Sequence, residues 1–251
     1  MVHDAAATGF GSNAEIYAGV RPSYHLALVE RFVEAYGRGQ VVELGAGTGI
    51  FTHQLLDAGV VPVAIEPVAA MRDQLAETCA PVVPLDGTAE ETGLPDDGAD
   101  TVVVAQAFHW FDHGPALDEI RRVLRRGGHL VCVWNVRDTS VEWVRAVTDI
   151  VDRYAGDTPR HRTMAWRQAI DDAPGFELVD DWSIENPKPS TPQGAVDRAL
   201  STSFIAALDD NEQAEVVAAT LAVTTPLGTP FDYPYRSELQ AWRWTNVDLA
   251  D

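Results

Sequence analysis

A short apolar strand pattern that runs into three alternating glycines constrains this chain more than any other feature. Residues 41–44 are apolar except for Glu43, and Gly45, Gly47 and Gly49 follow before a helix-period pattern begins. This order predicts a buried strand, a tight turn and the N-terminus of a helix. The turn needs glycine because positive φ is easy only without a Cβ, and because a backbone without Cβ atoms can closely approach a ligand.

Two phosphate-binding glycine loops do not fit this spacing. A P-loop requires a lysine and a serine or threonine after its last glycine, whereas Ile50 and Phe51 follow Gly49. The dinucleotide fingerprint requires glycines at its first, third and sixth positions, and Ile50 occupies the sixth. A nicotinamide-dependent oxidoreductase is therefore disfavoured, and no residue pair suited to hydride transfer is evident.

Glu43 with its three glycines resembles motif I of the class I S-adenosylmethionine (SAM)-dependent methyltransferases. The resemblance covers residues 14–135 through several ordered motifs and the remainder more loosely. It points to the small-molecule enzymes related to biotin-, ubiquinone- and trans-aconitate-type methyltransferases. It implies an α/β, Rossmann-like fold with a seven-stranded, mostly parallel sheet, an antiparallel last strand and a helical lid over the substrate.

The length of 251 residues fits one α/β domain. Within that domain, the resemblance implies an N-terminal helical cap at residues 14–37 and a cofactor-binding core at 38–135. Residues 136–251 would supply the lid elements and the last two strands. Strand patterns lie at 41–44, 61–66, 82–85, 101–105, 129–135, 176–184 and 231–244; helix patterns lie at 22–37, 51–58, 68–75, 115–126, 140–154, 160–170, 191–208 and 212–223.

A carboxylate at the next predicted strand end supports a nucleoside ligand. Glu66 lies 21 residues after Gly45, where a carboxylate can accept hydrogen bonds from both ribose hydroxyls. The resemblance implies SAM as cofactor and S-adenosylhomocysteine as product, with Glu43 near the amino group. The cofactor-binding candidates are Tyr17, Arg21, Glu43, Gly45, Ala46, Gly47, Thr48, Gly49, Glu66, Pro67, Met71, Thr88, Ala89 and Gln106.

Some of these candidates have a structural alternative. Tyr17 and Arg21 would cap the methionine end of the pocket, or else be a core aromatic residue and an exposed cation. Met71 would face the adenine edge, and the residues after Gly87 would reach the adenine amino group. Thr88 stands where many relatives have aspartate, so its side-chain contact to adenine is an open question.

The polar and aromatic residues after the 101–105 strand are the expected place for chemistry, because ligands bind at the carboxyl ends of parallel strands. His109 is the candidate general base, since imidazole titrates near neutral pH; the alternative is a hydrogen-bonded pocket wall. His109 and His113 lack a third ligand, so no metal is expected. The substrate-pocket candidates are Tyr24, Phe108, His109, Trp110, Trp134 and Asn135.

The charge balance restricts the partners. The net charge of −20 would repel phosphate backbones and anionic lipid, so nucleic acid and membranes are not expected partners. The basic run 121–126 is interpreted as the last turns of a helix. No secretory signal or membrane span is evident, which predicts a cytoplasmic monomer or homodimer acting on a small molecule. Oxygen, nitrogen and carbon acceptors stay open, as does a SAM-binding protein that transfers no methyl group.

Overall fold

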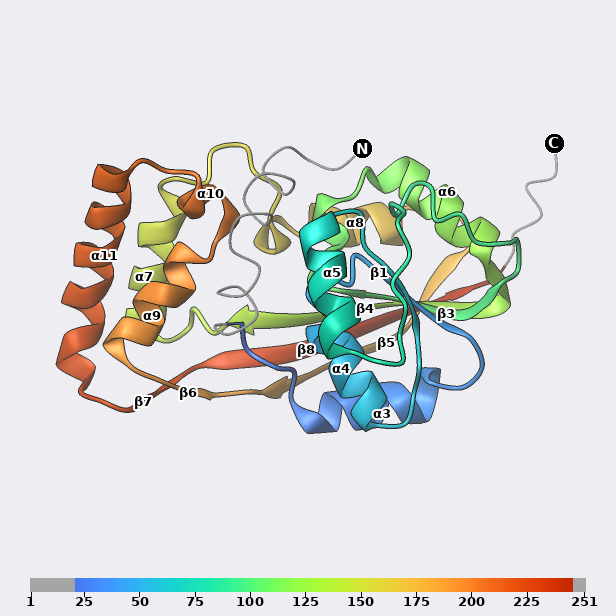
Figure 1. The fold of residues 1–251 in the computed structure, drawn as a ribbon, viewed down its shortest axis with the longest axis horizontal. Coiled ribbons are helices and arrows are strands. Elements are labelled where there is room, and N and C mark those ends of the chain that lie inside the picture. The colour runs from blue at the N-terminus through green and yellow to red at the C-terminus, as the bar shows by residue number, and fades with distance from the viewer. Residues whose placement is uncertain (1–20, 246–251) are drawn as a thin grey trace.

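A six-stranded sheet in the order β2-β1-β3-β4-β8-β5 forms the centre of the molecule (Figure 1). The computed structural model describes residues 21–245, so Tyr17 lies outside the described residues. The strands β1 to β4 are parallel, and β8 runs antiparallel to both β4 and β5. Their bounds are β1 Val41–Leu44, β2 Val63–Ile65, β3 Ala99–Ala105, β4 Leu124–Arg137, β5 Phe176–Glu185 and β8 Tyr235–Trp244. The strands β8 and β5 thus form the far edge of the sheet.

The expected seventh strand is reduced to a single bridge. Within residues 82–85, Leu85 bridges to Ile65 of β2, with its N–H donating to the Ala64 carbonyl at 2.8 Å. The preceding Pro84 has no N–H to donate to a ladder, which stops the pairing from extending. Within residues 21–245 the main sheet therefore has six strands, not seven, although the edge of β2 is still covered.

Helices cover both faces of the sheet (Figure 1). One face packs on α3 (Leu26–Tyr36) and α4 (Ile50–Asp57), and the other on α6 (His113–Val123) and α8 (Ala165–Asp171). The helix α5 (Ala69–Thr78) lies beside β2. The first of these helices begins later than Pro22, because the His25 side chain caps it by accepting from the Ala27 N–H at 3.1 Å.

Four further helices gather beyond one end of the sheet, within the part of the chain expected to supply the lid, and we call them the lid helices (Figure 1). They are α7 (Glu142–Asp152), α9 (Pro192–Leu200), α10 (Ser203–Ala206) and α11 (Asp210–Thr224). Their apolar sides share a core that includes Ile150, Ile205 and Val216. Thr191 caps α9 by accepting from the Gly194 N–H, but the predicted 191–208 helix divides at residues 201–202.

Several predicted elements have different ends for local reasons. Pro234 interrupts the expected terminal strand, so residues 231–233 form a separate β7 that pairs with β6 (Lys188–Ser190). Met164, with φ of 57°, separates the short helix η2 (His161–Thr163) from α8. Two other single-turn helices are η1 (Phe108–Trp110) and η3 (Thr225–Leu227). No helix within residues 21–245 combines the length and apolar character that crossing a bilayer requires.

Only the first half of the basic run 121–126 forms the end of a helix as predicted, with Arg121 and Arg122 in the last turn of α6. The helix α6 ends at Val123, because Leu124 is buried and pairs with Ala99 of β3. Arg125 and Arg126 therefore lie at the start of β4. Arg125 pairs with the Asp100 carboxylate, so its charge is balanced locally by a side chain rather than by helix carbonyls.

The outer strand β5 carries acidic side chains along its length. Asp180 accepts two hydrogen bonds from Arg31 of α3, and Asp181 pairs with Arg167 of α8. Glu177 and Glu185, near its two ends, are exposed. The sheet thus ends in a strand whose polar side chains are held by neighbouring helices.

Candidate active site

The glycine loop between β1 and α4 has the predicted backbone conformation. Gly45, Gly47 and Gly49 have φ of 65°, 58° and 87°. A Cβ at Gly49 would lie 2.7 Å from Cys79 Sγ, so packing alone requires that glycine. A Cβ at Gly47 would meet only Met71 Sδ, at 4.0 Å, because this glycine faces a cavity. The loop therefore leaves its middle residue open to a ligand.

Glu66 at the end of β2 is held rigidly beside this loop. Its Oε2 accepts from the Gly47 N–H at 2.8 Å and its Oε1 from the Val68 N–H at 2.8 Å. Burial raises the pKa of Glu66, against the lowering effect of these two backbone hydrogen bonds. Each carboxylate oxygen keeps a second lone pair. The group therefore retains the capacity to accept from a diol.

Glu43 is fully buried, and only one of its two carboxylate oxygens has a hydrogen-bond partner among the described residues. Its Oε2 accepts from Thr52 Oγ1 at 2.7 Å, while Oε1 has no hydrogen-bond partner among residues 21–245. Burial raises the pKa of Glu43 to about 8; the Thr52 hydrogen bond opposes this and the nearby Glu66 adds to it. A ligand ammonium group would satisfy the orphaned oxygen. Both acidic residues thus fit a ligand with a diol and a cationic amine.

Most of the predicted cofactor residues line one cavity at the carboxyl ends of β1, β2 and β3, which we call the donor cavity. Gly49 packs against Cys79 and does not line the cavity, and Tyr17 is not described. Tyr24 and Trp110, expected around the substrate, also line this cavity. The predicted cofactor residues on its wall are Arg21, Glu43, Gly45, Ala46, Gly47, Thr48, Glu66, Pro67, Met71, Thr88, Ala89 and Gln106.

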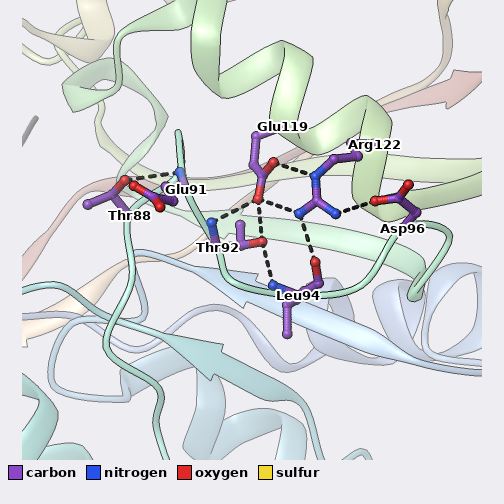
Figure 2. Close-up of polar contacts among 7 residues, drawn as sticks. All are labelled: Thr88, Glu91, Thr92, Leu94, Asp96, Glu119 and Arg122. Atoms are coloured by element: carbon purple, nitrogen blue, oxygen red, sulfur yellow. Dashed lines mark hydrogen bonds and ion pairs between the residues drawn. The ribbon is translucent and has the colours of Figure 1, made fainter.

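The loop that carries Thr88 and Ala89 is fastened to α6 by a polar network (Figure 2). Glu119 accepts from the Thr92 N–H at 2.8 Å and from Arg122 through both carboxylate oxygens. Arg122 also donates to the Leu94 carbonyl at 2.8 Å. The Arg122 guanidinium, chiefly, lowers the pKa of Glu119 to about 2. This network fixes one wall of the donor cavity from outside.

We expect Arg122→Gln to loosen this wall. Loss of the paired hydrogen bonds to Glu119 should lower the free energy of unfolding by about 1–2 kcal/mol at pH 7, since the pair is partly exposed. SAM affinity should fall several-fold. Since the folded-state pKa of Glu119 is depressed, the stabilisation is present above about pH 4.5 and is lost as pH falls toward 2.

Urea unfolding across this pH range and calorimetric titration with SAM measure both effects. Arg126→Gln, at an exposed position outside the network, is the matched control. Equal acid sensitivity and equal SAM affinity in the two variants would contradict the positioning role of Arg122.

A second, more polar cavity adjoins the donor cavity, and we call it the acceptor cavity. The two share four wall residues: Arg21, Gln106, Trp110 and Arg198. His109 and Asn135 line only the acceptor cavity. Phe108 and Trp134, which were expected in the substrate pocket, are fully buried and line neither cavity. Their apolar rings pack in the core with Trp166 instead.

Comparisons with known proteins agree with this geometry. A family model described as a methyltransferase domain matches residues 42–132. An uncharacterized methyltransferase of Mycobacterium tuberculosis is 39% identical over 195 residues, which cover 78% of this chain and 76% of the relative. The chain belongs to the class I SAM-dependent methyltransferases. The methyltransferase therefore uses SAM as its cofactor.

Relatives and solved structures extend the agreement. An uncharacterized methyltransferase-like protein of Schizosaccharomyces pombe is 32% identical over 63% of this chain and 64% of its own. The structure of a protein assigned as a type II methyltransferase from Anaeromyxobacter dehalogenans has a TM-score of 0.58 and 26% identity, covering 89% of this methyltransferase and 96% of that chain. A SAM-dependent methyltransferase from Thermotoga maritima, with 17% identity, shares the fold at a TM-score of 0.54, over 94% of this chain and 96% of its own.

His109 of the methyltransferase is half-buried against aromatic rings. It lies 4.9 Å from Trp110 and 5.6 Å from Trp134, measured between ring centroids. Burial, followed by the positive field of His161 and Arg160, lowers the pKa of His109 to about 3. Its Nδ1 has no hydrogen-bond partner among the residues described. The imidazole is therefore neutral at physiological pH.

Asn135 at the end of β4 ties distant segments together. Its Nδ2 donates to the Pro22 carbonyl at 2.8 Å, and its Oδ1 accepts from Ser237 Oγ at 2.6 Å and Asn186 Nδ2 at 3.1 Å. Sequence reasoning missed Asn186 and Ser237, since they lie 51 and 102 residues from Asn135. The methyltransferase thus uses this amide to fix the chain that carries Arg21 against the sheet.

Proposed function

We propose that this methyltransferase transfers the methyl group of SAM to a small-molecule acceptor bound in the acceptor cavity. The observation that carries the proposal is the shared wall of the two cavities, formed by Arg21, Gln106, Trp110 and Arg198. A donor in one cavity and an acceptor in the other would meet at this wall. The donor side already offers the groups that a nucleoside with a cationic amine requires.

The contribution of the protein is mainly alignment. When bound, SAM supplies a methyl group on a sulfonium that leaves as a neutral thioether, so no acid is needed. Glu66 would hold the ribose and Glu43 the amino group, which fixes the donor relative to the shared wall. Trp110 would exclude water there. Gln106, with φ of 60° and a hydrogen bond from Nε2 to the Asn135 carbonyl, would keep the wall in place. Such alignment supplies several kcal/mol of catalysis.

We infer that His109 acts as a neutral wall of the acceptor cavity rather than as the general base. A base works best when its pKa lies near the operating pH, and the pKa of His109 is lowered to about 3. We therefore expect His109→Gln to retain kcat/KM within about tenfold, whereas loss of a general base costs about 100-fold or more. The pH profile of kcat/KM should show no inflection from this residue between pH 5 and 8. A hundredfold loss together with disappearance of an inflection near pH 6.5 would restore the general-base role.

The direct test is an acceptor screen that follows formation of S-adenosylhomocysteine from SAM. Acceptor-dependent turnover above the blank without acceptor supports methyl transfer, and mass spectrometry identifies the methylated atom. Tight binding of SAM with no turnover across the screen would instead favour the alternative, a SAM-binding protein of the same fold with a regulatory role or another reaction.

Trp110→Ala should lower kcat more than SAM affinity, because the shared wall acts on the reacting pair.

A further inference from the structure

The acceptor cavity concentrates positive charge in an otherwise acidic protein. The whole chain has 18 Lys and Arg against 38 Asp and Glu, yet six arginines line this one cavity. Asp149 is the acidic residue on the described wall. The arginines come from the segment before α3, from the end of β4, from α7 and α9, and from the segment around η2: Arg21, Arg137, Arg145, Arg160, Arg162 and Arg198.

Among residues 21–245, carboxylates do not balance the five arginines other than Arg21. Asp152 pairs with both Arg160 and Arg162, so one carboxylate serves two guanidinium groups. Arg160 Nη1 is buried and has no hydrogen-bond acceptor among residues 21–245. Even without Arg21, five arginines therefore face two carboxylates, those of Asp149 and Asp152.

Two of the arginines converge on a phenol instead of an acid. Arg198 is 8% exposed, and its Nε donates to the Tyr235 hydroxyl at 3.1 Å. Burial would raise the pKa of Tyr235, but the positive charges of Arg198 and Arg137 outweigh it and lower that pKa. No ion pair joins either arginine to a carboxylate within the described chain. Buried cations without a counter-anion are costly, so a bound anion would relieve this arrangement.

We propose that the acceptor cavity is an anion-recognition site, in which Arg137 and Arg198 hold a carboxylate or phosphate group of the acceptor. The inference rests on the proposed function, because it assigns a chemical class to the same acceptor. Guanidinium groups bind both kinds of anion through paired, charge-assisted hydrogen bonds. Arg198 also lines the donor cavity, so an anion held there lies beside the shared wall, whereas Arg137 lines the acceptor cavity alone.

Anion titrations of the protein saturated with S-adenosylhomocysteine test the inference. Calorimetry at fixed ionic strength would use three probes: citrate, inorganic phosphate and the uncharged triethyl citrate. We expect citrate or phosphate to bind and the ester not to bind; the tighter of the two anions identifies the preferred group. Arg137→Gln should weaken that anion about 10- to 100-fold without changing the affinity for S-adenosylhomocysteine. Arg137→Lys, which keeps the charge but loses the paired geometry, should fall in between.

Two further variants serve as a control and as a second test of the anion site. Arg126→Gln makes the same charge change at an exposed position outside both cavities and should leave anion binding unchanged. Arg145→Gln removes an exposed arginine of the acceptor cavity, and it should weaken the anion several-fold even if Arg137→Gln does not fold. If S-adenosylhomocysteine itself does not bind, the proposed function fails. If it binds but neither anion does, or if Arg137→Gln and Arg145→Gln bind anions as the wild type does, the anion site alone is overturned.

Discussion

Glu66→Ala should raise the dissociation constant for SAM at least about 100-fold. The carboxylate would accept from two ribose hydroxyls, and each hydrogen bond to a charged group is worth about 1.5–3 kcal/mol. Two of them at the lower bound correspond to about 100-fold in affinity. Calorimetric titration with SAM and with S-adenosylhomocysteine measures the loss, which should be similar for both ligands because they share the ribose.

The control must separate ribose contact from loop damage, because Glu66 also holds the Gly47 and Val68 N–H groups. An analogue of S-adenosylhomocysteine without its two ribose hydroxyls provides this separation. The wild type should lose most of its affinity for the analogue, and Glu66→Ala should bind the two ligands nearly equally. Glu77→Ala, an exposed glutamate of α5, should behave as the wild type. If Glu66→Ala preferred S-adenosylhomocysteine over the analogue as strongly as the wild type does, the Glu66 carboxylate would not be the group that binds the ribose hydroxyls.

Stability of the cofactor-free protein should fall as the pH rises from about 7 to 8, a range in which imidazoles with a lowered pKa, such as those of His109 and His161, are largely neutral in both the folded and the unfolded state. The pKa of Glu43 is raised to about 8, above its ordinary value of 4.5, so in this range the folded state holds a proton that the unfolded state has lost. The favourable contribution is complete below about pH 4.5 and is lost as the pH rises through the folded-state pKa. Each pH unit in the range costs up to about 1.4 kcal/mol. Urea unfolding at several pH values measures this slope.

Glu43→Gln keeps the shape of the side chain and removes its titration. It should abolish the slope and make the cofactor-free protein more stable than the wild type at pH 8. SAM should also bind Glu43 in its ionised form, so binding at pH 7 should release up to one proton, detected as a dependence of the binding enthalpy on the ionisation enthalpy of the buffer. Glu43→Gln should release none. Parallel stability profiles of the wild type and Glu43→Gln between about pH 7 and 8 would show that the buried carboxyl has an ordinary pKa.

The part of the donor cavity formed by the glycine loop, Glu43 and Glu66 was predictable because these residues are encoded locally. The glycine loop, Glu43 and the following helix are contiguous, and Glu66 lies one strand–helix–strand unit away. Parallel pairing of β1 with β2 then brings both strand ends to the same edge of the sheet. Neither step depends on the lid, so sequence spacing was sufficient.

The acceptor cavity was not predictable in the same way. Arg137, Arg160 and Arg198 are spread over more than 60 residues of sequence and belong to no common motif. They meet only because the lid helices pack beyond the end of β4. The predicted ends of some helices and strands were wrong for a related reason, because single residues determine where these elements end. Pro234 divided the terminal strand, and pairing of Leu124 with β3 shortened α6.

The acidic outer strand β5 has a consequence for how copies of this protein meet. An exposed sheet edge is a template for strands of other molecules, and charged side chains on it are one way that proteins prevent such pairing. Antiparallel addition of a second β5 would bring rows of carboxylates from the two copies together, on molecules that each carry a net charge of −20. The strand thus acts as a barrier to sheet-to-sheet aggregation, and it directs any self-association toward other surfaces of the molecule.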